Sequence, residues 1–319
     1  MGQYDAAFIG TALVDSIVRG FDPTPVSASG FRAVSGTLSP GGEAVNAAVA
    51  ASKLGVRARI VCSLGADDAG ELVLAALRKN GVDISAVLRS GEHPTPVSTL
   101  LVNRDGTRKS ITNSAHRYNF HPERYARRFT GGRLVVLGSL FRAPFDEPGV
   151  IEGVLRAARR HNQLVLADTK LPNFNRLSLE DIAPLLPMID YIFPNEDEAR
   201  YYSGEETPER MAEVFLRYGV KNVVIKLGAQ GCCLFNKDES IRAAGYAVDA
   251  VDATGAGDNF LAAFAAALLR GEKHASALRL ANVCGAICAT GIGAASALRD
   301  MEQAERFLAE RGDCIQPEG

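Results

Sequence analysis

The sequence lacks several features that would point to particular classes of protein. It contains no tryptophan, only five histidines, and six cysteines that include no CxxC pair and no histidine-rich neighbourhood. Structural zinc is therefore not expected, and we interpret the cysteines as reduced, buried thiols. The 35 basic and 37 acidic residues give a net charge of −2, which provides no attraction to nucleic acid or to anionic membranes. We expect no nucleic-acid partner and no membrane partner.

Long hydrophobic segments of the kind that target or anchor a protein are also scarce. The N-terminal ten residues contain an acid and lack a basic segment followed by a long apolar one, so no signal peptide is evident and a cytoplasmic location is expected. Residues 280–298 carry no charge, but they include three glycines together with Asn282, Thr290 and Ser296. This segment is too polar for lipid, and we predict a buried helix followed by a Gly-rich turn.

The remaining composition, 47% hydrophobic and 23% charged, is typical of a globular protein, and its patterning indicates an α/β fold. Short apolar, β-branched runs alternate with amphipathic helical segments, which predicts a three-layer, mainly parallel sheet within a single domain over residues 1–319. Ligands of such sheets bind beyond the carboxyl ends of the strands. The predicted strands are 6–10, 58–65, 133–139, 163–168, 191–195 and 222–228, and the clearest helices are 44–55, 69–81 and 150–162.

Two segments depart from this alternation. Residues 13–38 and 97–113 alternate polar and apolar side chains without an intervening helix, and Asp105-Gly106 is a hairpin signal. We predict a small antiparallel flap, or lid, outside the main sheet and over the ligand crevice. Its exposed edge or face is also predicted to form a homodimer.

The segment with the clearest chemistry is 252–260, DATGAGDNF, followed by an apolar helical run. Gly255 and Gly257 allow the backbone to approach a ligand, and the helix directs its free N–H groups to the same point, which makes an anion hole. Asp258 would repel a bound anion, but it suits a base that takes a proton from a hydroxyl attacking a phosphoryl group. Without other motifs, an ordinary helix cap would explain the segment equally well.

Other motifs occur in order along the chain, and together they resemble the ribokinase-like (PfkB) family of carbohydrate kinases. DATGAGDNF resembles the family's C-terminal signature, and the match runs from about residue 6 to residue 309. The other segments that resemble family motifs are 41–48 (GGEAVNAA), 65–70 (GADDAG), 195–198 (NEDE) and 226–231 (KLGAQG).

The resemblance implies an ATP-dependent kinase that transfers the γ-phosphoryl group to a hydroxyl of a small sugar or polyol. Asp258 would be the catalytic base, with Gly255, Ala256 and Gly257 as the anion hole. Asp15 suits two neighbouring hydroxyls and Asn46 offers both a donor and an acceptor, although a turn cap and a plain helix start are the alternatives. The implied substrate-binding residues are Asp15, Gly41, Gly42, Asn46, Arg108 and Lys170.

The resemblance also implies the nucleotide and ion sites. Glu198 would organise Mg²⁺ through water, although an acidic helix start would otherwise explain NEDE. The implied ATP-binding residues are Asn195, Glu198, Lys226, Gly228, Gly231 and Asn282. A monovalent cation such as K⁺ is implied beside the anion hole, held mainly by backbone oxygens at positions matching Asp252, Thr254, Cys288, Gly291 and Gly293. Ala297 replaces a serine often found in the family.

Three substrate classes stay open within the family. A nucleoside kinase needs an apolar slot for the base; Phe8, Phe21 and Phe31 are candidates, but no tryptophan is available. A phosphosugar kinase needs fixed cations. Arg108, Lys109, Arg142 and Lys170 are candidates for these, yet Glu43 replaces the lysine usual in ribokinases and would repel a phosphate. A neutral sugar or polyol is the preferred substrate.

Two further classes are less compatible with the sequence. A dehydrogenase needs GxGxxG after the first strand, whereas residues 10–15 read GTALVD. A non-catalytic sugar or nucleotide sensor on the same scaffold would be marked by loss of Asp258 or of the anion-hole glycines, and all of them are present.

Overall fold

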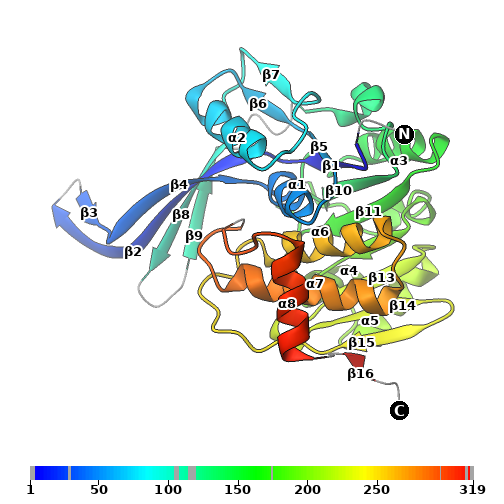
Figure 1. Cartoon of the computed structure of the whole chain (residues 1–319). Coiled ribbons are helices and arrows are strands. Elements are labelled where there is room, and N and C mark those ends of the chain that lie inside the picture. Colours follow the sequence, from blue (N-terminus) through cyan, green and yellow to red (C-terminus); the bar gives the residue numbers. More distant parts are fainter. Residues whose placement is uncertain are drawn as a thin grey trace.

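A large, mainly parallel sheet forms the centre of the computed structural model, which describes residues 4–27, 30–103, 108–113, 120–173, 175–294, 296–312 and 315–316 (Figure 1). Its nine strands within the described residues lie in the order β16 (Ile315–Gln316), β15 (Ser240–Ala243), β14 (Cys232–Asn236), β13 (Asn222–Lys226), β12 (Tyr191–Phe193), β11 (Leu164–Thr169), β10 (Leu134–Leu140), β1 (Ala6–Gly10) and β5 (Ala58–Val61). The six neighbouring strands from β13 across to β5 pair in parallel, and β14, β15 and β16 extend the sheet in antiparallel fashion.

Helices cover both faces of this sheet, which explains why its strands are apolar throughout. The helices are α1 (Glu43–Lys53), α2 (Asp68–Lys79), α3 (Pro148–Arg160), α4 (Glu196–Ser203), α5 (Pro208–Arg217), α6 (Ala256–Leu269), α7 (His274–Ala289) and α8 (Met301–Arg311). In β10, Leu134 and Val136 join the core under α1, α6 and α7, whereas Val135 and Leu137 join the core under α3 and α5. The predicted three-layer α/β fold is confirmed.

The uncharged segment that begins at Leu280 is the second half of α7, and it is buried as predicted. The helix ends at Ala289, and Gly291 and Gly293 follow in the turn. No helix in the described part of the chain is long and apolar enough to cross a membrane.

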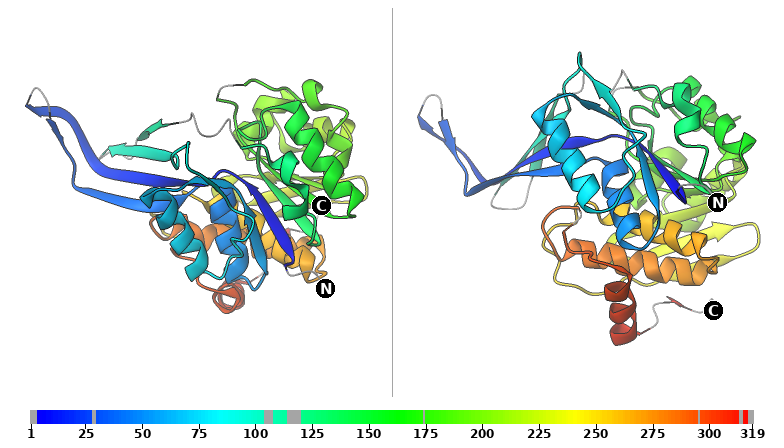
Figure 2. Two further views of the ribbon diagram at one scale, coloured as in Figure 1. Left: turned by 90° about the horizontal axis from the view of Figure 1, so that it is seen from above. Right: turned by 45° about the horizontal axis from the view of Figure 1, so that its top comes forward.

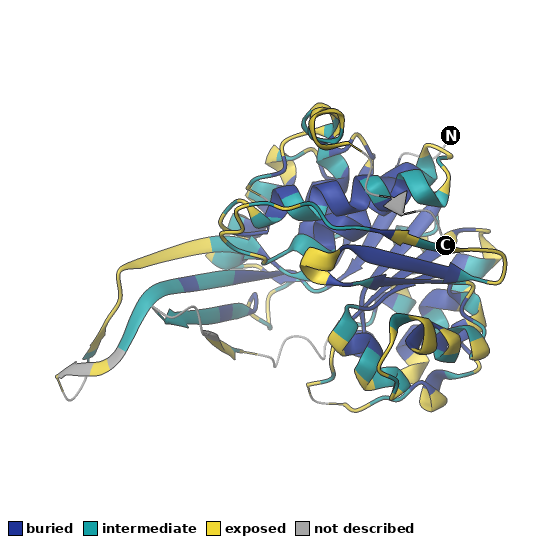
Figure 3. Cartoon of the chain, turned by 90° about the horizontal axis from the view of Figure 1, so that it is seen from below, coloured by how far each residue is buried: buried dark blue, intermediate teal, exposed yellow. Residues whose placement is uncertain are grey.

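A second sheet projects from the core and forms the lid (Figure 2). Its strands are β2 (Leu13–Ser27), β3 (Gly30–Arg32), β4 (Ser35–Gly41), β8 (Val97–Asn103) and β9 (Arg108–Thr112). Figure 3 shows that buried residues are concentrated in the core, whereas much of the projecting sheet is half-buried or exposed. The first lid segment reaches Gly41, three residues beyond the predicted limit of 38.

Two details differ from the sequence-based expectation. The predicted strand 58–65 divides at Cys62: β5 stays in the central sheet, and β6 (Ser63–Gly65) pairs instead with β7 (Leu88–Ser90). Within the lid, β2 pairs with β4 and β8 with β9 in antiparallel fashion, but β2 and β8 are parallel. They pair side by side because each enters the lid from the core in the same direction. The Asp105-Gly106 turn lies outside the described residues.

Candidate active site

A cleft of about 510 Å³ separates the lid from the carboxyl ends of the central strands. The lid contributes hydroxyl and apolar side chains and one carboxylate, Asp15, and most of the charged side chains come from the core. Its lining is Leu13, Asp15, Gly42, Glu43, Asn46, Ser98, Leu100, Ser110, Thr112, Arg142, Lys170, Asn173, Thr254, Gly255 and Asp258. Six of the predicted site residues therefore line one cleft: Asp15, Gly42, Asn46, Lys170, Gly255 and Asp258.

The Gly-rich turn places the start of α6 at the floor of this cleft. Gly255 precedes the helix with a φ of 78°, and a Cβ there would lie 2.2 Å from the Ala294 Cβ, so only glycine fits. Asn259, one turn into α6, donates to the carbonyls of Gly255 and Ala294 at 2.8 and 2.7 Å. These bonds fix the turn against the 291–294 loop. The first N–H groups of α6 are consequently presented to the cleft.

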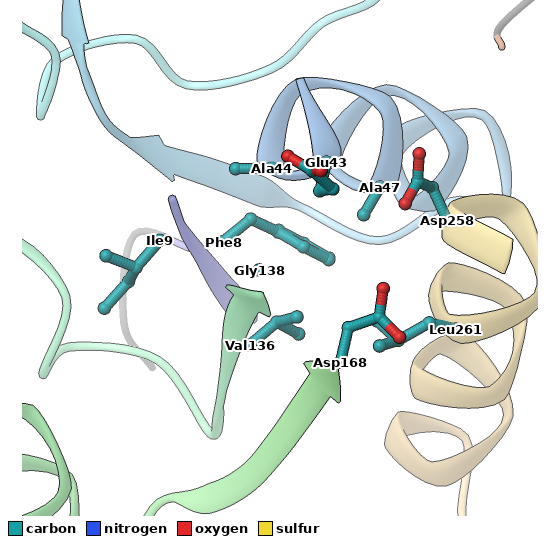
Figure 4. A pocket seen from close by; sticks show the side chains of 10 residues that line it. All are labelled: Phe8, Ile9, Glu43, Ala44, Ala47, Val136, Gly138, Asp168, Asp258 and Leu261. Carbon is teal, nitrogen blue, oxygen red and sulfur yellow. The ribbon is translucent and has the colours of Figure 1, made fainter. Parts of the chain in front are cut away.

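Asp258 lies in this first turn with a carboxyl group that is almost completely buried. Asn46 Nδ2 donates to its Oδ2 at 2.8 Å. Burial raises the pKa of Asp258 to about 7; Lys170 and the Asn46 bond oppose the rise, and Glu43 and Asp168 add to it. Figure 4 shows Glu43, Asp168 and Asp258 around the same small cavity. A carboxyl group with this pKa can accept and release a proton near neutral pH.

Lys170 offsets the negative charge of these groups. Burial works to lower the pKa of its ammonium, but the carboxyl groups of Glu43, Asp258, Asp168 and Glu198 outweigh burial and raise that pKa. The ammonium therefore stays positively charged beside Asp258.

Two glycines bring the lid hinge close to the other polar side chains of the cleft. A Cβ on Gly41 would lie 2.1 Å from Asp15 Oδ2, and a Cβ on Gly42 would lie 2.3 Å from the Thr11 carbonyl oxygen. Gly42 also has a φ of 100° and immediately precedes α1. The GG pair thus lets Asp15 and α1 approach each other closely.

Asn195 and Glu198 form a capping box at the start of α4. The Asn195 side chain accepts from the Glu198 N–H at 2.9 Å, and Glu198 Oε2 accepts from the Asn195 N–H at 3.0 Å and from Thr169 Oγ1 at 2.8 Å. Burial raises the pKa of Glu198, and Lys226 opposes that rise.

The Lys226 side chain reaches toward the start of α6 and Asp168. Its Nζ donates to Asp168 Oδ1 at 2.7 Å and lies 3.3 Å from where a Cβ on Gly257 would be. The ammonium of this predicted ATP-binding residue thus lies between the end of β11 and the first turn of α6.

The Gly228–Gly231 turn and Asn282 converge on the end of β15. Gly231 has a φ of 100°, and a Cβ there would lie 2.0 Å from the Ala243 carbonyl oxygen. Asn282 Nδ2 donates to the carbonyl oxygens of Ala244 and Ala243 at 3.0 and 3.4 Å. Asn282 therefore holds the chain that leaves β15, a structural role that accounts for a polar residue in α7.

The five residues implied as ligands of a monovalent cation lie around the loop before α6. Asp252 is the most constrained of them, because its carboxylate accepts the N–H groups of Thr254 and Gly293 at 3.0 and 3.1 Å. The Cys288 thiol lies 3.5 Å from the Thr254 carbonyl oxygen. Burial raises the pKa of this thiol to about 12, so it stays protonated.

Some candidates do not come together. Phe8 lies in β1 and is completely buried. Phe21 and Phe31 instead contact each other in the lid with centroids 5.5 Å apart, and Phe31 is 60% exposed. The three rings therefore do not form a common apolar slot for a nucleoside base.

Two of the predicted cations are not among the described residues that line the cleft. Ser110 and Thr112 line it, so the alternation of side chains along a strand places Lys109 on the opposite face of β9. The Arg108 side chain lies outside the described residues.

Sequence reasoning missed Asp168 and Asn259. Asp168 could have been recognised as an acid at the carboxyl end of a buried strand, which is where ligands bind in this fold. Asn259 gave no comparable signal, because its partners are carbonyl groups that only the folded chain brings near.

A three-layer core, a lid sheet and a Gly-rich turn that starts a buried helix define a ribokinase-like fold. The family described as pfkB family carbohydrate kinase matches residues 9–301, so the chain belongs to this family. Its members transfer a phosphoryl group to a hydroxyl acceptor, and this chain is a carbohydrate kinase of that type.

Individual relatives are similar over nearly their whole length. The chain is 26% identical over 307 residues to an ATP-dependent 6-phosphofructokinase of Thermoanaerobacterium thermosaccharolyticum, covering 94% of this chain and 92% of that protein. It is 28% identical over 276 residues to a ribokinase of Haemophilus influenzae, covering 85% and 88%. The solved structure of Arabidopsis thaliana ribokinase complexed with ribose and ATP superposes with a TM-score of 0.85 at 26% identity, covering 97% and 99%.

We predict that Lys170→Met raises the pKa of Asp258 above its value of about 7, because it removes the main charge that opposes the rise. Carbon-13 NMR of aspartate carboxyl groups would measure this, with Asp258→Asn identifying the signal. Lys221→Met removes a lysine that pairs with Asp190 instead and is the control. An Asp258 carboxyl that titrates near 4 in the parent protein would contradict this account of the site.

Proposed function

We propose that this protein is an ATP-dependent kinase for a neutral sugar or polyol, with Asp258 as the general base. The observation that carries the proposal is the buried Asp258 carboxyl at the start of α6, bonded to Asn46 and facing the cleft beneath the lid. The acceptor hydroxyl gives its proton to Asp258, and its oxygen forms the new bond to the γ-phosphorus as the bond to the ADP oxygen breaks. The N–H groups of Gly257 and Asp258, in the first turn of α6, stabilise the charge that develops.

The remaining site residues are assigned from their positions. Asp15 and Asn46 bind hydroxyls of the acceptor, and the Ser98, Ser110 and Thr112 hydroxyls of the lid complete a polar enclosure. Lys170 and Lys226 hold positive charge near the transferred group. Gly228 and Gly231 shape the turn beside which ATP binds.

Mg²⁺ fits this site only as an ion held largely by phosphates and water. The carboxylate of Glu198 already accepts from Thr169 and Asn195, and no group of three or more histidine, cysteine or acidic residues in the described chain is arranged to hold a metal ion. Asn195 and Glu198 would hold the ion through its waters, and the bound ion would neutralise phosphate charge.

A phosphosugar is the second candidate acceptor, because Arg142 and Lys170 both line the cleft. Against it, Glu43 and Asp15 line the same cleft, and the charge of Lys170 is balanced by surrounding carboxylates. An ADP-release screen over neutral sugars, polyols, phosphosugars and nucleosides decides between them. A kcat/KM highest for a neutral acceptor supports the proposal, and a phosphosugar or nucleoside optimum overturns it.

Asp258→Asn is predicted to lower kcat by roughly 10²- to 10⁴-fold, the range for loss of a general base. ATP affinity should hold, because a negative charge near the γ-phosphate is removed. In the parent enzyme kcat/KM should fall below about pH 7, since protonated Asp258 accepts no proton. Steady-state kinetics over pH would measure both effects. Asp238→Asn, on an exposed turn, is the control; near-normal turnover of Asp258→Asn would mean that another group takes the proton.

Gly41→Ala should raise KM for the acceptor roughly 10- to 100-fold with a smaller effect on kcat, because the new Cβ would displace the Asp15 carboxylate and its charge-assisted hydrogen bonds. Gly36→Ala is a matched control in the same strand, since no atom lies within 4 Å of a Cβ there. Equal KM values for the two variants would show that Asp15 does not bind the acceptor.

The lid is also proposed to form a homodimer through the face turned away from the cleft. Leu38 and Ile111 lie on that face and are 63% and 67% exposed. Sedimentation should give a dimer, and a Leu38→Asp, Ile111→Asp double variant should be monomeric. Tyr201→Asp, an exposed apolar position on α4, should leave the dimer intact. A monomeric parent protein would refute the proposal.

A further inference from the structure

An arginine of the lid forms an ion pair with the loop that precedes the anion hole. Arg19, on β2, donates from Nη2 to Asp252 Oδ2 at 2.8 Å. The side chains are 29% and 11% exposed, so the pair is largely shielded from water. The Nε atom of Arg19 is buried without a hydrogen-bond partner within the described part of the chain. The guanidinium charge is therefore screened less than that of a surface arginine.

The Asp252 carboxylate has no open position left for another cation. Its Oδ1 accepts from the N–H and Oγ1 of Thr254 at 3.0 and 2.6 Å. Its Oδ2 accepts from Gly293 N at 3.1 Å in addition to Arg19. Each oxygen thus accepts two donors, which is the capacity of a carboxylate.

Two of the other positions implied for a monovalent cation already accept hydrogen bonds from the protein. The carbonyl of Cys288 accepts the Gly291 N–H at 3.3 Å, and the carbonyl of Thr254 faces the Cys288 thiol. Ala297 provides no hydroxyl where a serine is often found. A potassium ion here would also be repelled by the guanidinium. The residues therefore do not fit the K⁺ site that the resemblance implies.

We propose that the Arg19 guanidinium takes the place of the monovalent cation, so that this kinase turns over independently of K⁺. The inference rests on the proposed kinase function. Arg19 acts as a positioning residue: through Asp252 it holds Thr254, directly before Gly255, and Gly293, directly before the Ala294 that packs on Gly255. Because Arg19 belongs to the lid, the ion pair also links lid position to the shape of the anion hole.

The test compares ADP release in potassium chloride and in tetramethylammonium chloride at equal ionic strength, with the best acceptor of the screen. The parent enzyme should have equal kcat in both salts. In tetramethylammonium chloride Arg19→Ala should lose at least about fivefold in kcat, the lower range for coupling between sites. Arg19→Lys, or added guanidinium at low millimolar concentration with Arg19→Ala, should recover part of that loss, which a merely structural role would not allow. Arg32→Ala, on exposed β3, should match the parent.

A second measurement needs no acceptor. The parent protein's Tm should be the same in the two salts, because no K⁺ binds at Asp252. A K⁺-specific rise in its Tm, a K⁺ requirement for its turnover, or full kcat of Arg19→Ala in tetramethylammonium chloride would each overturn the inference. If no acceptor in the screen is phosphorylated, the proposed function fails, and the Tm comparison still decides the cation question.

Discussion

The hydrogen bond from Asn46 to Asp258 joins the two helices on which the site is built. It links α1, which follows the lid hinge, to α6, which follows the Gly-rich turn. The two helices contact each other in the core on one face of the central sheet, and buried alanines are frequent in both. Their proximity brings the Asn46 amide within hydrogen-bond distance of the buried Asp258 carboxyl.

Burying several carboxyl groups at one point requires compensating positive charge. Asp168 is paired directly with Lys226, while Lys170 lies among Glu43, Asp258, Asp168 and Glu198 without being committed to any single one. This balance of charges keeps the pKa of Asp258 at about 7, so that the carboxyl group is not permanently protonated. The proposed function uses this balance: two ammonium groups would face a phosphate, and carboxylates would accept hydrogen bonds from the hydroxyls of a neutral acceptor.

The lid is connected to this chemistry at two places. At its base, Gly41 and Gly42 carry the chain from β4 directly into α1, beside Asp15. Further out, Arg19 contacts the loop that shapes the anion hole. Movement of the lid would consequently alter both the acceptor site and the floor of the cleft.

Much of the fold could be predicted from the local pattern of apolar and polar residues. Continuous apolar strands such as 134–140 are buried on two faces, and this requires helices on both sides whatever the details of packing. The motifs also pointed to Gly255, where a φ of 78° favours glycine, and to Asp258 and Asn46, whose side-chain chemistry suits the predicted reaction. Strand pairing in the lid was less accessible, since β2 and β8 are far apart in sequence and only packing on the core makes them parallel neighbours.

The pairing of charged and polar side chains in the site depends on contacts between residues that are far apart in the sequence. Lys226 pairs with Asp168, Asn282 binds the end of β15 and Arg19 pairs with Asp252, each across tens to hundreds of residues. A side chain's local sequence does not specify such partners, because the electrostatic and hydrogen-bonding energy depends on distances that exist only after folding. The sequence by itself indicated the α/β architecture and the Gly-rich turn before α6. Only the tertiary structure decided which charges meet there, and hence that a lid arginine lies where a cation was expected.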